Sequence, residues 1–292
     1  MDKLTEKIRE YALKIGADEI GFSNIERFSE APPQYQPLAL LPTAKSIICM
    51  SIRILKGVQI PQKNLVQNYQ YQMFGYGWLS NIRLNNLGFE VARYIEDEGF
   101  TSLPFPSFCD SQNPELQPEW ARRVKPVISN RHAAVACGIA TFGWNNLALT
   151  KKYGSRNRFV TIITNAKLEP TPMIEEEYCK NCGMCVKKCP GKAIAKEASV
   201  SFNIGGKKIK IAELKRPTCS WYHDGMATET FGTVPFVRSK EPTWDEVYAK
   251  RRAVDMLSPN QFGGRIIAFT TGGHCGQCLL QCPVGTKWKT IK

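Results

Sequence analysis

The residues best suited to chemistry are cysteines, which form two short motifs. The first motif reads C-x2-C-x2-C-x3-C-P, and the second reads C-x2-C-x3-C-P. Such spacings are typical of iron–sulfur proteins, in which three thiolates bind one cluster and the fourth points toward another. The second motif has only three cysteines, so two sets of four need one more thiolate. Cys219, which lies between the motifs and follows a proline, is the best candidate.

We therefore predict two 4Fe-4S clusters with crossed ligand sets, as in two-cluster ferredoxins. The first set is Cys179, Cys182, Cys185 and Cys282. The second set is Cys189, Cys219, Cys275 and Cys278. Zinc is an alternative because it also binds four cysteines, but it does not explain the evenly spaced third cysteine of the first motif. Eleven cysteines in 292 residues is too low a density for a disulfide framework.

The net charge of +13, from 39 Lys and Arg against 26 Asp and Glu, favours anionic partners such as nucleic acid or an acidic electron donor. No known nucleic-acid-binding motif accompanies the charge. The N-terminal residues lack the apolar core of a leader, and no run of 18 apolar residues occurs, so we expect no membrane span. Free thiols then predict a cytoplasmic protein.

The elements that position the cysteines follow from hydrophobic periodicity. Apolar residues at helical spacing predict helices over 2–16 and 79–98. Continuous apolar runs predict buried strands over 46–54 and 158–164. Between the cysteine motifs, a hairpin over 200–211 is expected to turn at a Gly-Gly pair.

The composition changes after a proline-containing linker that ends at residue 172. We predict an α/β domain over residues 1–172 and a ferredoxin-like module over 173–292. An aromatic segment at 63–78 is interpreted either as a packed loop or as the wall of a cofactor or substrate pocket. Three further cysteines are expected to bind no metal: Cys49 as a core residue, and Cys109 and Cys137 as pocket or core thiols.

Several segments together resemble the epoxyqueuosine reductase family, which is related to the reductive dehalogenases. The similarity covers nearly the whole chain and includes the glycine turn at 137–145, Tyr-Gly-Ser at 153–155 and Leu-Glu-Pro at 168–170. The resemblance implies an α/β (α+β) fold in which a nitroreductase-like, cobalamin-binding domain precedes a bacterial ferredoxin-like domain with two clusters. It departs from the family at Thr141 and Trp144, where the family has Trp and Lys.

The resemblance also implies site residues. The predicted cofactor-binding residues are His132, Gly138, Phe142, Gly143, Trp144, Asn145, Tyr153 and Ser155. In this family an acidic residue in an Asp-Thr/Ser segment is thought to donate the proton, and Asp110 is the nearest equivalent. The helical-repeat extension that helps many members hold tRNA is not expected here, which weakens the expectation of a tRNA substrate.

The implied activity is that of a reductase whose clusters reduce cobalamin, which then removes oxygen or another leaving group from the substrate. One alternative is a reductive dehalogenase-like enzyme that acts on a small molecule. Another is a non-catalytic electron-transfer protein that reduces a partner's cofactor. The expected partners are an electron donor such as ferredoxin or flavodoxin, and a substrate that is either a modified tRNA nucleoside or a small organic molecule.

Overall fold

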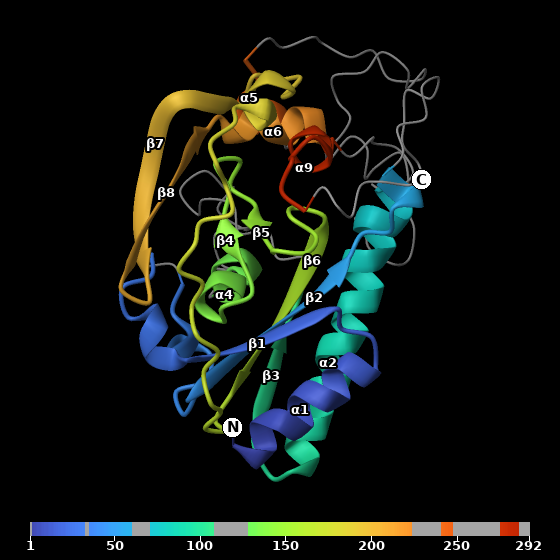
Figure 1. The fold of residues 1–292 in the computed structure, drawn as a ribbon, viewed down its shortest axis with the longest axis vertical. Helices are drawn as coiled ribbons and strands as arrows, with labels where there is room; N and C mark the ends of the chain where they lie inside the picture. The colour runs from blue at the N-terminus through green and yellow to red at the C-terminus, as the bar shows by residue number, and fades with distance from the viewer. Residues whose placement is uncertain are drawn as a thin grey trace.

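The computed structural model describes residues 2–32, 35–59, 71–107, 128–223, 241–247 and 275–285. The fold is mixed α/β, as predicted, and is built around a four-stranded antiparallel sheet (Figure 1). The strands, in spatial order, are β1 (Glu19–Asn24), β2 (Ser46–Arg53), β6 (Asn157–Thr164) and β3 (Ser102–Phe105). β2 and β6 therefore match the predicted strands to within one residue at each end.

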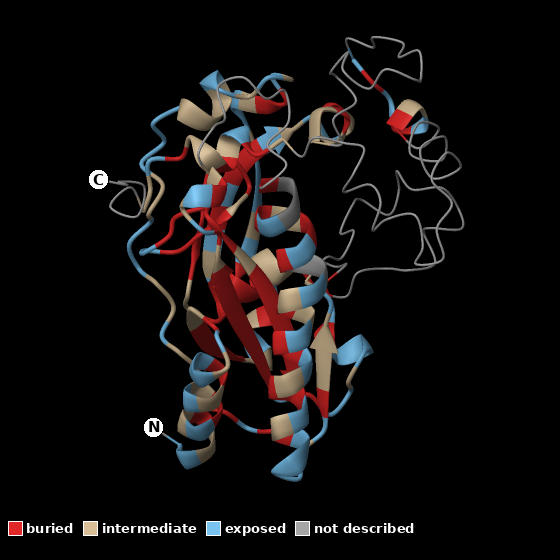
Figure 2. Ribbon diagram, turned by 90° about the vertical axis from the view of Figure 1, so that its right-hand side faces the viewer, coloured by how far each residue is buried: buried red, intermediate tan, exposed pale blue. Residues whose placement is uncertain are grey.

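Both faces of this sheet are buried, which explains why its central strands are continuously apolar. Alternate residues of β2 enter different cores, because side chains along a strand point to opposite faces. Ile48 and Met50 pack in one core, and Ile47 and Cys49 pack in the other. Figure 2 shows these buried strands beside the helices that cover them.

Two helices, α1 (Lys3–Lys14) and α2 (Leu84–Asp97), cover the first face. In α2 the buried residues Leu87, Val91 and Ile95 are four apart and therefore form one stripe. The predicted helix over 79–98 begins differently, because π-helical turns at Tyr71–Gly77 and Leu79–Arg83 precede α2. A π turn holds more residues than an α turn, and the buried Leu79 accordingly lies five positions before the buried Leu84. Ile82 lies two positions before Leu84, on the opposite side of the helix, and is 47% exposed.

The second face is covered by α4 (Asn130–Ala136) and by the hairpin of β7 (Ile194–Ile204) and β8 (Lys207–Leu214). The hairpin turns at Gly205 and Gly206, as predicted, and both glycines have a positive φ. It is longer than expected, and its isoleucines share a core with α4. An element beyond residue 172 thus packs against the first part of the chain, and the division into two domains at that residue stays a prediction.

The remaining elements are short. The 3-10 helices are Ile25–Phe28, Pro37–Ala39 and Gly57–Gln59. A small two-stranded sheet pairs β4 (Thr141–Phe142) with β5 (Ala148–Leu149). Three short helices, α5 (Met184–Lys187), α6 (Arg216–His223) and α9 (Gln277–Leu280), gather at one end of the main sheet (Figure 1). α5 carries Cys185 of the first motif, α9 carries Cys278 of the second, and α6 carries the isolated Cys219.

Candidate metal centres

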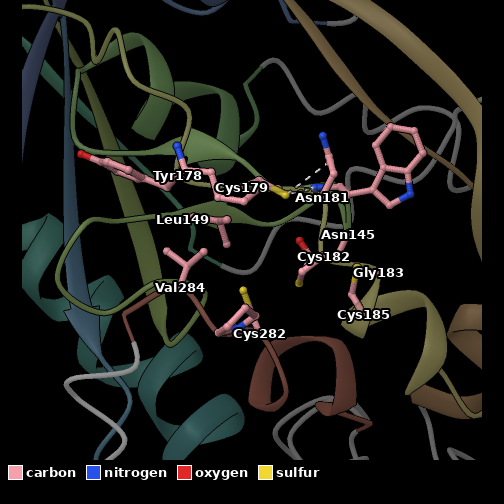
Figure 3. Close-up of a pocket in the computed structure, with 14 residues that line it drawn as sticks. Asn145, Leu149, Tyr178, Cys179, Asn181, Cys182, Gly183, Cys185, Cys282 and Val284 are labelled. Carbon is pink, nitrogen blue, oxygen red and sulfur yellow. Dashed lines mark hydrogen bonds between the residues drawn. The ribbon is translucent and has the colours of Figure 1, made fainter.

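Four thiols line one pocket at the end of the molecule where α5 and α9 lie (Figure 3). They are Cys179, Cys182, Cys185 and Cys282, the set predicted for the first cluster. Two residues with positive φ, Asn181 and Gly183, bend the chain between the first three cysteines. The pocket holds about 450 Å³ of empty space, part of which is open to solvent.

The thiols of this first set repel one another when ionised. Burial, and to a lesser extent the charges of the other three thiolates, raises the pKa of Cys185 to about 11. A thiolate at this position therefore needs a cation beside it at neutral pH. The exposed residue of the set is Cys182.

The second predicted set also comes together. Burial is the main cause that raises the pKa of the Cys278 thiol. The charges of Cys219, Cys275 and Cys189 raise this pKa further, in that order of size. These are the other three members of the set, although they belong to three separate segments of the chain. Cys278 is also close enough to Cys185 for their charges to interact, so the two sets are neighbours.

The donor chemistry of both sites fits iron–sulfur clusters, because each set consists of four thiols. Within the described ranges, no three Cys, His, Asp or Glu groups are arranged around a single metal ion. Four thiols that line a cavity, by contrast, leave room for a cluster of several atoms. The role of these eight cysteines as ligands stays a prediction that the geometry supports.

Side chains from the part of the chain before residue 172 hold the second cysteine motif. The Asn145 amide donates to the Cys278 carbonyl at 3.1 Å, and the Ser155 hydroxyl donates to the Leu279 carbonyl at 2.8 Å. Both acceptors are carbonyls of α9, which is too short to satisfy them internally. Two residues that the resemblance assigns to the cofactor thus bind the cysteine loop.

A third residue with this role, Arg156, was not identified from the sequence. Its side chain is fully buried, and its guanidinium donates to the carbonyls of Leu280, Cys282 and Val284. The residues around Arg156 in the sequence do not indicate these contacts, because the acceptors lie more than 120 positions further along the chain.

Two of the predicted cofactor-binding residues line the first pocket next to Asn145. They are Gly143 and Trp144. The Trp144 backbone N–H points to the Cys179 sulfur at 3.4 Å, and its indole N–H donates to the Ala195 carbonyl at 2.9 Å. The backbone of Trp144 therefore contacts the first cysteine motif, and its indole contacts β7.

Gly138 and Tyr153 have structural contacts in the described part of the chain. A Cβ atom at Gly138, where φ is +69°, would lie 2.2 Å from the Pro172 carbonyl oxygen, so only glycine admits the linker there. The buried Tyr153 donates its hydroxyl to the Asp18 carboxylate at 3.3 Å. Neither contact involves the cysteine sets.

His132 and Phe142 lie in an aromatic cluster with Tyr35 and Phe202. Burial, with smaller contributions from nearby arginines, lowers the pKa of His132 to about 3, so the imidazole is neutral at pH 7. Its Nδ1 is buried and has no hydrogen-bond partner. Among the residues predicted to bind cofactor, His132 thus offers a buried polar atom to a ligand.

Aromatic residues from the 63–78 segment lie next to the second cysteine set. The Tyr71 ring packs within 3 Å of where a Cβ of Gly276 would lie, and its hydroxyl accepts a hydrogen bond from Arg158 at 3.1 Å. The Arg158 guanidinium also lies over the Tyr76 ring, which contacts His223 of α6 edge-on. The contacts of Tyr71 and Tyr76 fit either interpretation of the segment, whose residues 63–70 fall outside the described residues.

The remaining candidates lie elsewhere. Asp110 and Cys109 fall outside the described residues. Cys49 and Cys137 are fully buried, and the Cys137 thiol donates to the Ile47 carbonyl at 3.4 Å. Both are core thiols, which confirms the prediction for Cys49 and decides between the two interpretations of Cys137.

Comparisons with known proteins agree with this geometry. The 4Fe-4S binding domain family matches residues 172–195, which include the first cysteine motif. Over 67 residues the chain is 34% identical to the tetrachloroethene reductive dehalogenase of Desulfitobacterium hafniense, covering 22% of this chain and 12% of the relative. Over 218 residues it is 24% identical to the epoxyqueuosine reductase of Bacillus subtilis, covering 66% of this chain and 52% of the relative.

Solved structures extend the likeness to the whole fold. A selenomethionine-labelled epoxyqueuosine reductase aligns over 99% of this chain and 67% of its own, with a TM-score of 0.58 at 20% identity. The chain therefore shares its fold with epoxyqueuosine reductases. A reductive dehalogenase whose structure suggested a mechanism for B12-dependent dehalogenation has a TM-score of 0.53 at 15% identity, over 94% of this chain and 37% of its own.

The chain spans about half the length of the curated epoxyqueuosine reductases that it matches. No helix in its described part is both long and apolar enough to cross a bilayer. It carries a 4Fe-4S binding domain, whereas the number of clusters is an inference from its cysteine sets.

Proposed function

We propose that the chain is a cobalamin-dependent reductase that passes electrons through two 4Fe-4S clusters to remove oxygen or another leaving group from its substrate. The observation that carries the proposal is the gathering of eight cysteines into two neighbouring sets of four. Such neighbours form a short electron relay, since Cys185 of one set lies close to Cys278 of the other. Electrons would enter from a donor such as ferredoxin or flavodoxin in the cytoplasm.

The order of the two clusters follows from their surroundings. The first set lines a pocket open to solvent and includes an exposed cysteine, so a donor protein can approach it. The second set lies beside Tyr71 and α6 and contains no exposed cysteine. Electrons would therefore pass from the first cluster to the second and then to the corrinoid.

The corrinoid would lie near the second cluster. When bound, it would supply a low-valent, strongly nucleophilic cobalt. The neutral His132, with its unpartnered Nδ1, would accept a hydrogen bond from one of the amide groups that a corrinoid carries. Tyr76 and His223 would provide aromatic contacts on the side of α6.

Asp110 is the proposed proton donor. A solved epoxyqueuosine reductase from B. subtilis has a catalytic loop that carries an aspartate, which supports this role by similarity. The carboxyl group would have to keep its proton near neutral pH and release it to the leaving oxygen. An Asp110→Asn variant should bind the corrinoid normally and lose most of its turnover.

The substrate class is part of the proposal. One solved epoxyqueuosine reductase holds an epoxyqueuosine-modified stem loop of tRNA-Tyr. The net charge of +13 would favour such an anionic substrate here. The runner-up is a small halogenated molecule, which the similarity to tetrachloroethene reductive dehalogenases over the cysteine region favours.

The test is anaerobic reconstitution with iron, sulfide and cobalamin, followed by absorption spectroscopy and turnover assays. We expect about eight irons and one corrinoid per chain, and reduction of epoxyqueuosine in a tRNA stem loop. Dehalogenation without tRNA turnover would favour the second activity. Eight irons without corrinoid uptake would contradict the proposal and leave an electron carrier.

A further inference from the structure

The buried Arg156 has a role that follows from the two-cluster proposal. We infer that Arg156 is a positioning residue for the first cluster, which holds the loop that carries Cys282 and supplies a positive charge to balance the cluster. This inference rests on the proposed function and adds a residue outside both cysteine motifs. It is carried by the contacts of one guanidinium group.

The geometry explains how the loop is held. The guanidinium donates to the Val284 carbonyl at 2.8 Å, to the Leu280 carbonyl at 3.5 Å and, by its closest contact, to the Cys282 carbonyl. These acceptors lie before, at and after the cysteine whose sulfur lines the first pocket. A planar donor group that binds three carbonyls at once fixes the loop more strictly than a lysine ammonium could.

The position of Arg156 in the chain makes the contact rigid. Its own backbone N–H donates to the Tyr153 carbonyl at 3.1 Å, and the guanidinium returns to the same carbonyl at 3.3 Å. The preceding turn contains Gly154, where a Cβ atom would lie 2.1 Å from the Val284 oxygen. The turn before Arg156 is therefore in direct backbone contact with the cysteine loop.

The charge of Arg156 points to an anion. The side chain is 0% exposed, and within the described ranges no carboxylate forms an ion pair with it. A buried cation is costly unless an anion compensates it, and carbonyl dipoles provide only part of that compensation. A cluster with four thiolates is negatively charged, and Cys282 is the acidic group whose charge acts on Arg156. A cluster bound by Cys282 would therefore compensate the charge of Arg156.

Three variants separate the two parts of the role. The Arg156→Lys variant keeps the positive charge but loses the planar set of guanidinium N–H donors. The Arg156→Gln variant loses both the charge and this set of donors. Arg9→Gln is the matched control, because Arg9 donates to the Ile20 carbonyl at 3.1 Å and lies on α1, away from the cysteines. Each full-length variant is reconstituted, and its iron content, its rate of iron loss to a chelator and its cluster potentials by EPR-monitored titration are measured.

In the Arg156→Lys variant we expect the first cluster to keep the potential that it has in the parent protein. The iron of that cluster, about half of the total, should be lost to the chelator several times faster than from the parent. Arg156→Gln should show a more negative potential for that cluster, because the reduced state gains a charge that is no longer balanced, or should retain only about half the iron. Arg9→Gln should match the parent. A Cys282→Ser variant identifies which EPR signal belongs to the first cluster.

Parent-like potentials and iron retention in Arg156→Gln would overturn the inference, as would identical behaviour of the Lys and Gln variants. If the Arg156→Gln variant does not fold, the Arg156→Lys variant tests the inference. A rate of iron loss equal to that of the parent protein would then contradict the inference. Fewer than two clusters in the unmodified chain would instead refute the proposed function. The two failures are therefore distinguishable.

Discussion

At the residue scale, the chemistry of the cysteines could be predicted but that of their neighbours could not. Cysteine spacing, with the place of Cys219 between the motifs, predicted two sets of four thiols, and the structure brings the members of each set together. Asn145 and Ser155 were selected by resemblance, yet their visible contacts are with the cysteine loop. Contacts between a side chain and a carbonyl 124 or more positions away leave no trace in local sequence.

His132 gives a prediction about pH. Its folded pKa of about 3 lies below the value of about 6.5 for an unfolded histidine, so only the unfolded state takes up a proton between them. Stability contributed by the neutral imidazole is therefore complete above pH 6.5 and is lost as the pH falls. The loss can reach about 1.4 kcal/mol for each pH unit in this window.

The test compares the apo protein with a His132→Phe variant, which suits the surrounding aromatic cluster. Denaturant unfolding is measured between pH 7 and pH 4. The free energy of unfolding of the variant should fall less steeply with acidification than that of the parent. Parallel pH profiles would show that the imidazole is not held neutral.

At the element scale, the sheet and its covering helices were predictable because their periodicity is strong. The strands β2 and β6 and the turn of the β7–β8 hairpin match expectation, since buried apolar runs and a Gly-Gly pair are direct signals. The π-helical turns before α2 were not anticipated. Their composition resembles that of an α-helix, and only the hydrogen-bond spacing differs.

The turn before β6 gives a second prediction. Gly154 has φ of +60° and has no room for a Cβ atom beside the Val284 carbonyl, which is main chain and cannot rotate away. Gly206 has φ of +76° and open space around it, so its replacement by alanine introduces backbone strain alone, about 1 kcal/mol. Gly154→Ala should cost roughly 1–3 kcal/mol more than Gly206→Ala in the free energy of unfolding.

Chemical denaturation and iron quantitation of both alanine variants check this prediction. The Gly154 variant should also lose iron, because the clash displaces the loop that carries Cys282. Equal destabilisation by the two substitutions would mean that the contact with Val284 is not needed.

At the scale of the whole molecule, the two halves of the chain are structurally interdependent. The hairpin beyond residue 172 shares a core with α4, and three side chains between residues 145 and 156 hold the second cysteine motif. A composition change correctly located the cysteine-rich region, but composition carries no information about this contact. We therefore expect the proposed domains to depend on each other for cluster binding.

A fragment of residues 173–292 tests this dependence. After reconstitution it should bind clearly less iron than the full chain, because α9 loses the donors that satisfy its carbonyls. Adding a 1–172 fragment should restore part of the iron. A fragment that alone holds as much iron as the full chain would show that the cysteine region is self-sufficient.

The most direct test of the account is iron and sulfide quantitation with EPR on the anaerobic full chain and on two single variants. Cys282→Ser and Cys219→Ser each remove a ligand from a different set. The account predicts about eight irons in the parent and about four in each variant, with a different EPR signal lost in each case. Zinc in the parent protein, or a Cys219→Ser variant that keeps all its iron and both signals, would contradict it.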